Sequence, residues 1–253
     1  MLRRHGVIAV GLVLAAGLLG TAGCTGDDPK PKPSSAAEPT GRFDGTQAPD
    51  GGEVRVVESG FTAFVDGNPT VTFGVLLENT SKNRAAVEVK VTAKLYDAAG
   101  KEVRLGAMSQ LASKSVTIMP GQRMGAGQDT GLSRSDVVGD PTELRVEIRT
   151  PSWYPASQVT GLALSDVKSE LDPSGLVVFS FSVESRLPEK VTDPHLIVLA
   201  RDHAGTLIGG YEPRPSPTAW PPGKSTQVAK TELPDAADRT RSEVFAGLSS
   251  IAE

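Results

Sequence analysis

The sequence predicts an all-β protein, with two tandem immunoglobulin-like β-sandwich domains that follow a cleaved export signal and a disordered linker. Three observations predict this fold class. Apolar and polar residues alternate over short runs, which is the period of a half-buried strand. A set of strand and turn landmarks occurs twice in the same order. Runs with the helical period of 3.6 are nearly absent, and only 133–138 and 235–240 are expected to hold a single helical turn.

The amino-terminal segment, 1–23, has the layout of an export signal. Arg3 and Arg4 give it a positive start, the apolar run 7–19 follows, and small residues lead to Cys24. That apolar run is shorter than the roughly 20 residues that a membrane-spanning helix needs. We therefore expect a signal peptide that is removed, rather than a transmembrane anchor.

The residues around Cys24 resemble the lipobox of bacterial prolipoproteins. Thr21-Ala22-Gly23-Cys24 has the small pair and the cysteine of that pattern, with Thr21 where the family usually has Leu. The resemblance implies cleavage before Cys24 and a diacylglycerol on its thiol, with acyl chains such as palmitate. Two acyl chains hold a protein firmly on a bilayer. The lipobox resemblance therefore implies a lipid-anchored protein on the extracytoplasmic face of the cell membrane.

Cys24 is the single cysteine of 253 residues, so no disulfide can form within the chain. A lone cysteine could be a buried apolar residue, an intermolecular bridge or a nucleophile. The position of Cys24 between the signal and the linker favours lipidation.

Cleavage removes two arginines and changes the formal net charge from −4 to −6. A mildly acidic chain argues against nucleic acid as a partner and against broad adhesion to anionic lipid.

Residues 24–52 are expected to form a disordered tether. Pro29-Lys30-Pro31-Lys32-Pro33 and the Ser, Ala, Gly and Asp residues after it bury too little surface to offset the entropy of ordering. The proline run favours extended polyproline II, as in a semi-rigid spacer. A proline-rich ligand motif is the alternative.

The two predicted domains, 53–152 and 153–253, share their landmarks. Asp97-Ala98-Ala99-Gly100 is echoed by Asp202-His203-Ala204-Gly205, and each is expected to form a hairpin turn in which Gly takes a positive φ. A Pro-Gly pair follows in both copies, and an apolar strand precedes both. Alternating runs at 71–77, 87–95 and 144–148 predict half-buried strands of the first domain, which we expect to fold alone.

The first domain resembles the FxLYD family of bacterial extracytoplasmic proteins. The resemblance lies in Ala93-Lys94-Leu95-Tyr96-Asp97-Ala98-Ala99-Gly100, in Asn79 before the preceding turn and in Pro120-Gly121, although Ala93 replaces the leading Phe. It implies a sandwich on a secreted, often lipidated protein, and it brings no catalytic residue and no established ligand. The second copy keeps only Asp202, Gly205 and Pro222-Gly223.

The strand expected at 196–200 is apolar on both faces, so something should cover its second face. The nearest candidate is the first domain, which is joined by the short segment 151–155. We expect the rings of Trp153 and Tyr154 to pack at that junction.

Catalytic and metal-binding chemistry is not expected, and neither is a cofactor. His195 and His203 lack further ligands nearby in the sequence, so no metal site is predicted. Ser165-Asp166-Val167-Lys168 fits the Ser-x-x-Lys pattern of penicillin-binding enzymes, but its surroundings predict a strand, which would separate the two side chains. Asp97 and Asp202 are not expected to act as paired carboxylates, because they occupy equivalent turns in separate domains. The sequence therefore predicts a chain that is not an enzyme.

A proline-rich segment at 211–222 replaces strand-like residues of the first copy. Its prolines cannot donate to a sheet, so it is expected at a sheet edge, where it blocks aggregation. The alternative is a polyproline II segment that meets a partner. The residues of that possible partner site are Tyr211, Pro213, Pro215, Pro217 and Trp220.

These observations predict a membrane-anchored extracytoplasmic lipoprotein. It would act as a non-enzymatic binding module for a protein or another component of the cell envelope. The alternative is a carrier lipoprotein for a small ligand or a metal, which would need a pocket and more aromatic residues than the 5% of this chain.

Overall fold

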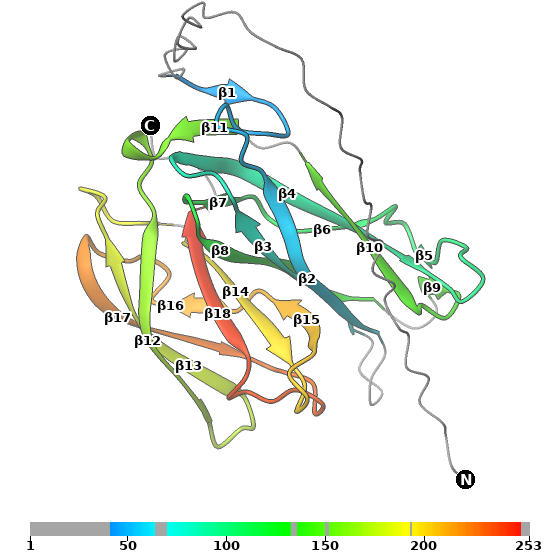
Figure 1. Ribbon diagram of the computed structural model, residues 1–253. Helices are drawn as coiled ribbons and strands as arrows, with labels where there is room; N and C mark the ends of the chain where they lie inside the picture. Colours follow the sequence, from blue (N-terminus) through cyan, green and yellow to red (C-terminus); the bar gives the residue numbers. More distant parts are fainter. Residues whose placement is uncertain (1–40, 64–69, 133–135, 150–151, 193, 249–253) are drawn as a thin grey trace, which may run out of the picture. The chain divides into compact units, whose positions relative to one another are not determined.

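The computed structural model describes residues 41–63, 70–132, 136–149, 152–192 and 194–248 (Figure 1). The predicted signal peptide, Cys24 and the first part of the predicted tether lie outside these residues. Strands dominate the described residues, which contain no α-helix, and a short 3₁₀ turn lies at Ala156–Gln158. Of the helical turn expected at 133–138, residues 133–135 lie outside the described residues, Asp136 is 3₁₀ and Val137–Val138 form a strand. The all-β prediction is confirmed. Residues 235–240 form non-helical turns.

The first half of the chain forms two antiparallel sheets around one apolar core. One sheet has the order β2-β3-β8, from Val54–Ala63, Thr70–Asn79 and Arg123–Gly131. The other has the order β1-β11-β4-β10, from Phe43–Asp44, Ser152–Pro155, Arg84–Tyr96 and Glu143–Arg149. Two short strands also pair with β4, namely β6 (Leu111–Ala112) and β7 (Val116–Ile118). A small ribbon joins β5 (Arg104–Leu105) to β9 (Val137–Val138).

The second half repeats this arrangement with a second core. Its outer sheet has the order β12-β13-β17-β16, from Leu162–Leu171, Val177–Ser185, Gly223–Thr231 and Arg214–Ser216. Its other sheet has the order β15-β14-β18, from Leu207–Tyr211, Pro194–Arg201 and Glu243–Leu248. Trp220 is fully buried in this core and meets the ring of Phe181 edge-on at 6.0 Å.

The sheets form four layers, with β2-β3-β8 and β15-β14-β18 facing each other in the middle (Figure 1). Strand β14 is buried on both faces, as the apolar run 196–200 predicts, and the first half covers its second face. Strand β3 is also buried on both faces, whereas its alternating sequence predicted one wet face. The two halves share the apolar cluster of Leu76, Ile197, Leu199 and Leu207. All of the described residues belong to one compact unit.

The landmark turns have the same hydrogen bonds in both halves. The amide of Gly100 donates to the carbonyl of Asp97, and that of Gly205 to the carbonyl of Asp202, at 2.9 Å each. Both glycines have a positive φ, 76° and 88°, which favours Gly because it has no Cβ. A third turn of this type, Asp172 to Gly175, joins β12 to β13. The turn chemistry predicted from the repeats is therefore present.

Regular structure is present before the predicted tether boundary at residue 52. Strand β1 pairs with β11, and the carboxylate of Asp50 accepts hydrogen bonds from the hydroxyl of Ser81 and the amide of Lys82. Strand β11 places Trp153 in the first core, with its Nε1 donating to the carbonyl of Gly45 at 2.8 Å. The segment expected to be a linker is thus a strand of the first sandwich.

Candidate functional site

A cleft of about 290 Å³ lies where the two halves meet, and we refer to it as the junction cleft. The first half lines it with β2, β3 and β8, and the second half with β15, the end of β17 and the chain that follows. Ligand sites are often found at such junctions. The lining residues are Thr62, Thr70, Thr72, Asp129, Tyr211, Thr231, Glu232, Leu233, Pro234 and Asp235.

Two threonines on the first-half side use their hydroxyl protons for the protein backbone. Thr62 Oγ1 donates to the carbonyl of Ile208, and Thr72 Oγ1 donates to the carbonyl of Gly210, each at 2.6 Å. The amide of Gly210 donates back to Thr72 Oγ1 at 3.1 Å. The buried Thr72 hydroxyl is therefore occupied by protein partners, whereas the Thr62 oxygen keeps lone pairs, because a hydroxyl oxygen has two. On this side of the cleft Thr62 thus offers a ligand a hydrogen-bond acceptor.

Three carboxylates, from Asp129, Glu232 and Asp235, stand in a lining that contains no Lys or Arg. Burial raises the pKa of the Tyr211 phenol above its ordinary value, and the charges of Asp129 and Glu232 raise it further. Beside the cleft, burial also raises the pKa of Glu212, although Lys114 Nζ lies 3.2 Å from its carboxylate and opposes the shift. The junction cleft is thus a polar, acidic site.

The junction cleft can accept hydrogen bonds from a small polar ligand. Among the described residues, no group of three or more His, Cys, Asp or Glu side chains is placed to hold a metal ion.

The predicted partner-site residues occupy two environments. Tyr211, at the end of β15, is 8% exposed and lines the junction cleft, and Trp220 is 0% exposed in the second core. Between them, β16 pairs with β17 at the edge of the outer sheet, which agrees with the interpretation of this segment as an edge. Pro213 is buried and Pro215 half-buried, so only Pro217 of the three prolines is exposed.

The other sequence candidates do not come together as sites. His195 is buried on β14, whereas the His203 side chain is 78% exposed in a turn, with Nδ1 3.4 Å from an oxygen of Asp238. Ser165 and Lys168 lie on β12 with a bulge between them, and they pair with Ser182 and Ser180. The bulge therefore leaves both on the same exposed face of the sheet rather than on opposite faces, and the Ser165 hydroxyl donates to the carboxylate of Asp166 at 3.0 Å. Cys24 lies outside the described residues.

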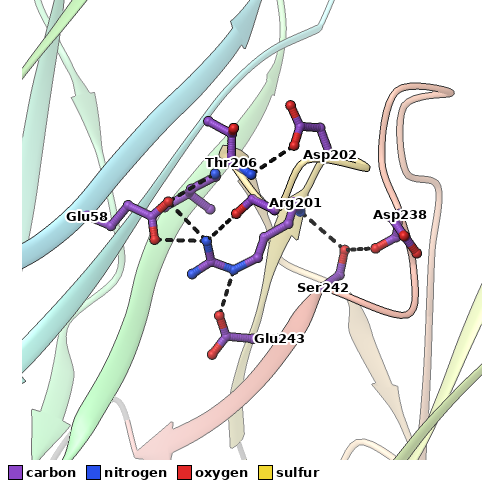
Figure 2. Close-up of polar contacts among 9 residues, drawn as sticks. Glu58, Arg201, Asp202, Thr206, Asp238, Ser242 and Glu243 are labelled. Carbon is purple, nitrogen blue, oxygen red and sulfur yellow. Dashed lines mark hydrogen bonds and ion pairs between the residues drawn. The ribbon is translucent and has the colours of Figure 1, made fainter. Parts of the chain in front are cut away.

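Arg201 is the centre of a polar cluster that sequence reasoning missed, and Figure 2 shows its contacts. Its guanidinium lies 2.8 Å from the carboxylate of Glu58 on β2 and 2.8 Å from that of Glu243 on β18. It also donates to the carbonyl of Gly205 at 2.9 Å. Glu58 in turn accepts from the amide of Leu207 at 3.1 Å. Arg201 takes the place of Tyr96 in the repeat, and that difference between the copies was the available signal.

No family model and no curated protein matches this chain. A crystal structure of the exo-chitosanase CsxA from Amycolatopsis orientalis is similar over 81% of this chain, at 14% identity and a TM-score of 0.23. Another structure of CsxA, described as an exo-β-D-glucosaminidase, is similar over 82%, at 15% identity and a TM-score of 0.23. The chain spans 26% of the length of these enzymes.

These matches correct the prediction that the chain is not an enzyme, because the matched proteins are enzymes. That prediction depended on the scarcity of His and Cys. Glycoside cleavage commonly uses a pair of carboxylic acids instead, and this chain has 30 Asp and Glu residues. The composition therefore does not exclude catalysis, while a TM-score of 0.23 assigns no activity to this chain.

Within the described ranges, no helix is long and apolar enough to span a membrane.

Proposed function

We propose that this chain is a membrane-anchored extracytoplasmic lipoprotein, in which the β-sandwich body is a binding module for a protein or another component of the cell envelope. The observation that carries the proposal is the position of Cys24. It follows an export signal and a small Ala-Gly pair, and a proline-rich segment follows it before the first strand at Phe43–Asp44. A lipid on Cys24 would hold the folded body beside the membrane, which a net charge of −6 would not do on an anionic surface.

Substitution of the cysteine tests the anchor. Cells that express Cys24→Ala should show no incorporation of a labelled palmitate analogue into the chain and no cleavage by the lipoprotein route. The matched control is Thr25→Ala, which leaves the lipobox residues intact and should label as the parent does. A Cys24→Ala chain that matures at the same site and stays in the membrane would contradict the proposal.

Cross-linking on intact cells tests the binding role. A reproducible envelope component captured by the parent chain, and lost when the chain is displaced from the membrane by Cys24→Ala, would support the proposal. Absence of any specific cross-link, at equal expression, would oppose it.

The junction cleft favours a second candidate function, the carriage of a small polar ligand. Its acceptors come from both halves of the chain, and its volume of about 290 Å³ is close to the lower end of the range for small-molecule sites. Native mass spectrometry after gentle purification should then show a bound small molecule. The double variant Asp129→Asn, Glu232→Gln should lose that mass. The control Glu143→Gln should keep it, because Glu143 lies on β10 and does not line the cleft. An empty parent chain would oppose this candidate.

A further inference from the structure

Glycines let the two middle sheets approach each other through their backbones. A Cβ on Gly60 would overlap the carbonyl oxygen of Leu207, and one on Gly74 would lie 2.5 Å from the carbonyl oxygen of Gly209. A Cβ on Gly210 would lie 3.1 Å from the Cα of Gly74. Stacked sheets normally lie about 10 Å apart because side chains fill the space between them. At these three glycine positions no side chain larger than hydrogen fits, and we call this backbone contact the glycine seam.

Hydrogen bonds cross the glycine seam and satisfy the backbone of β15, which is an edge strand of its own sheet. The carbonyls of Ile208 and Gly210 accept from Thr62 and Thr72, and the amide of Gly210 donates to Thr72. Separation of the halves would leave these hydroxyls and backbone groups to water. The first half therefore supplies partners that the sheet of β15 lacks.

An apolar contact and an ion bridge flank the glycine seam. Leu76 of the first half packs with Ile197 and Leu199 of the second, and all three are at most 3% exposed. Arg201 joins Glu58 of the first half to Glu243 of the second. Neighbouring domains commonly move because their interface is modest and polar. The interface between these two halves instead contains fully buried apolar side chains, as the interior of a domain does.

We propose that the two halves are one cooperative body, in which neither half keeps its fold without the other, and that the junction cleft is therefore preformed and not opened or closed by a hinge. The proposal does not depend on what the protein binds or on the lipid. It differs from the sequence-based expectation that the first domain folds alone, because the face of β3 that carries Thr72, Gly74 and Leu76 is an interior surface.

The two tryptophans provide the test, because each reports on one half. Trp153 lies in the first core and Trp220 in the second, and both are 0% exposed. In the full chain, Trp220→Phe leaves the fluorescence of Trp153, and Trp153→Phe leaves that of Trp220. Each variant is unfolded by denaturant while its fluorescence and its β-type circular dichroism are followed. In each variant the two signals should give the same midpoint, as expected for all-or-none unfolding.

A seam substitution then tests whether the glycines couple the halves. Gly74→Ala, made in both single-tryptophan backgrounds, should lower the midpoint reported by Trp153 and the midpoint reported by Trp220. The control is Gly131→Ala, where a Cβ meets nothing within 4 Å, and it should move neither midpoint by a comparable amount.

Two results would overturn the proposal. One is a fluorescence midpoint that differs from the dichroism midpoint of the same variant. The other is a Gly74→Ala effect that is confined to Trp153. Should a single-tryptophan variant fail to fold, hydrogen exchange of the unaltered full chain decides the question. Protection of β3 and β13 should disappear at the same denaturant concentration, and loss at different concentrations would contradict the proposal.

Discussion

Replacement of Trp220 distinguishes a structural role of the proline segment from a binding role. The side chain is fully buried, its ring packs edge-on against Phe181, and its backbone amide and carbonyl both pair with Val191. Removal of a buried aromatic side chain costs about 3–5 kcal/mol of the free energy of unfolding. For a chain of this size, that loss corresponds to a fall in melting temperature of roughly 6–20 °C.

The indole Nε1 is buried and makes no hydrogen bond with the described residues, so Trp220→Phe forfeits packing but no polar contact. We expect this variant to lose about 1–2 kcal/mol, well below the loss in Trp220→Ala. Thermal unfolding followed by circular dichroism measures both. If Trp220→Ala leaves the melting temperature unchanged and abolishes capture of a cross-linked partner, the core assignment is refuted and the segment is a binding site.

Two further substitutions test the local chemistry. Asn79→Ala should lower the free energy of unfolding, measured by urea denaturation, by about 2–4 kcal/mol. The reason is that the buried side-chain amide of Asn79 donates to the carbonyls of Arg84 and Ile118 and accepts from the backbone amide of Ser81. A loss below about 0.5 kcal/mol would contradict this. The Asp172 carboxylate accepts from Ser174 and Lys230, which holds its pKa at about 2. Because this pKa is depressed, its stabilising effect is present above its unfolded pKa of about 4 and is lost as the pH falls to about 2. Asp172→Asn should therefore lower the melting temperature at pH 7 and make little difference at pH 2, and equal effects at both would contradict the assignment.

The strands and turns could be predicted because their causes are local. Alternation at 87–95 and 144–148 corresponds to β4 and β10, and the Asp-x-x-Gly pairs form the expected turns. The doubly apolar run 196–200 also indicated a covered face, and β14 is covered. In these segments the residue pattern itself determines the conformation.

The junction could not be predicted because its causes are long-range. Thr72, Gly74 and Leu76 form the second, polar-looking face of β3, and nothing local indicates that another sheet covers it. Glycines inside strands at 60, 74 and 209–210 were the available signal, since Gly in a strand often marks a close approach of another backbone. The junction cleft could not be predicted for the same reason, because only the packing of the halves brings Asp129 of the first half to Tyr211 and Glu232 of the second. Residues 41–52 were assigned to the tether on composition alone, while their partners, such as β11, lie about a hundred residues away.

Mass spectrometry of the mature chain, extracted from membranes and digested, tests the proposed anchor most directly. The proposal predicts an amino-terminal peptide that begins at Cys24 and carries the mass of a diacylglycerol on its thiol. A mature chain that begins at another residue, or one whose Cys24 carries a free thiol, would contradict it.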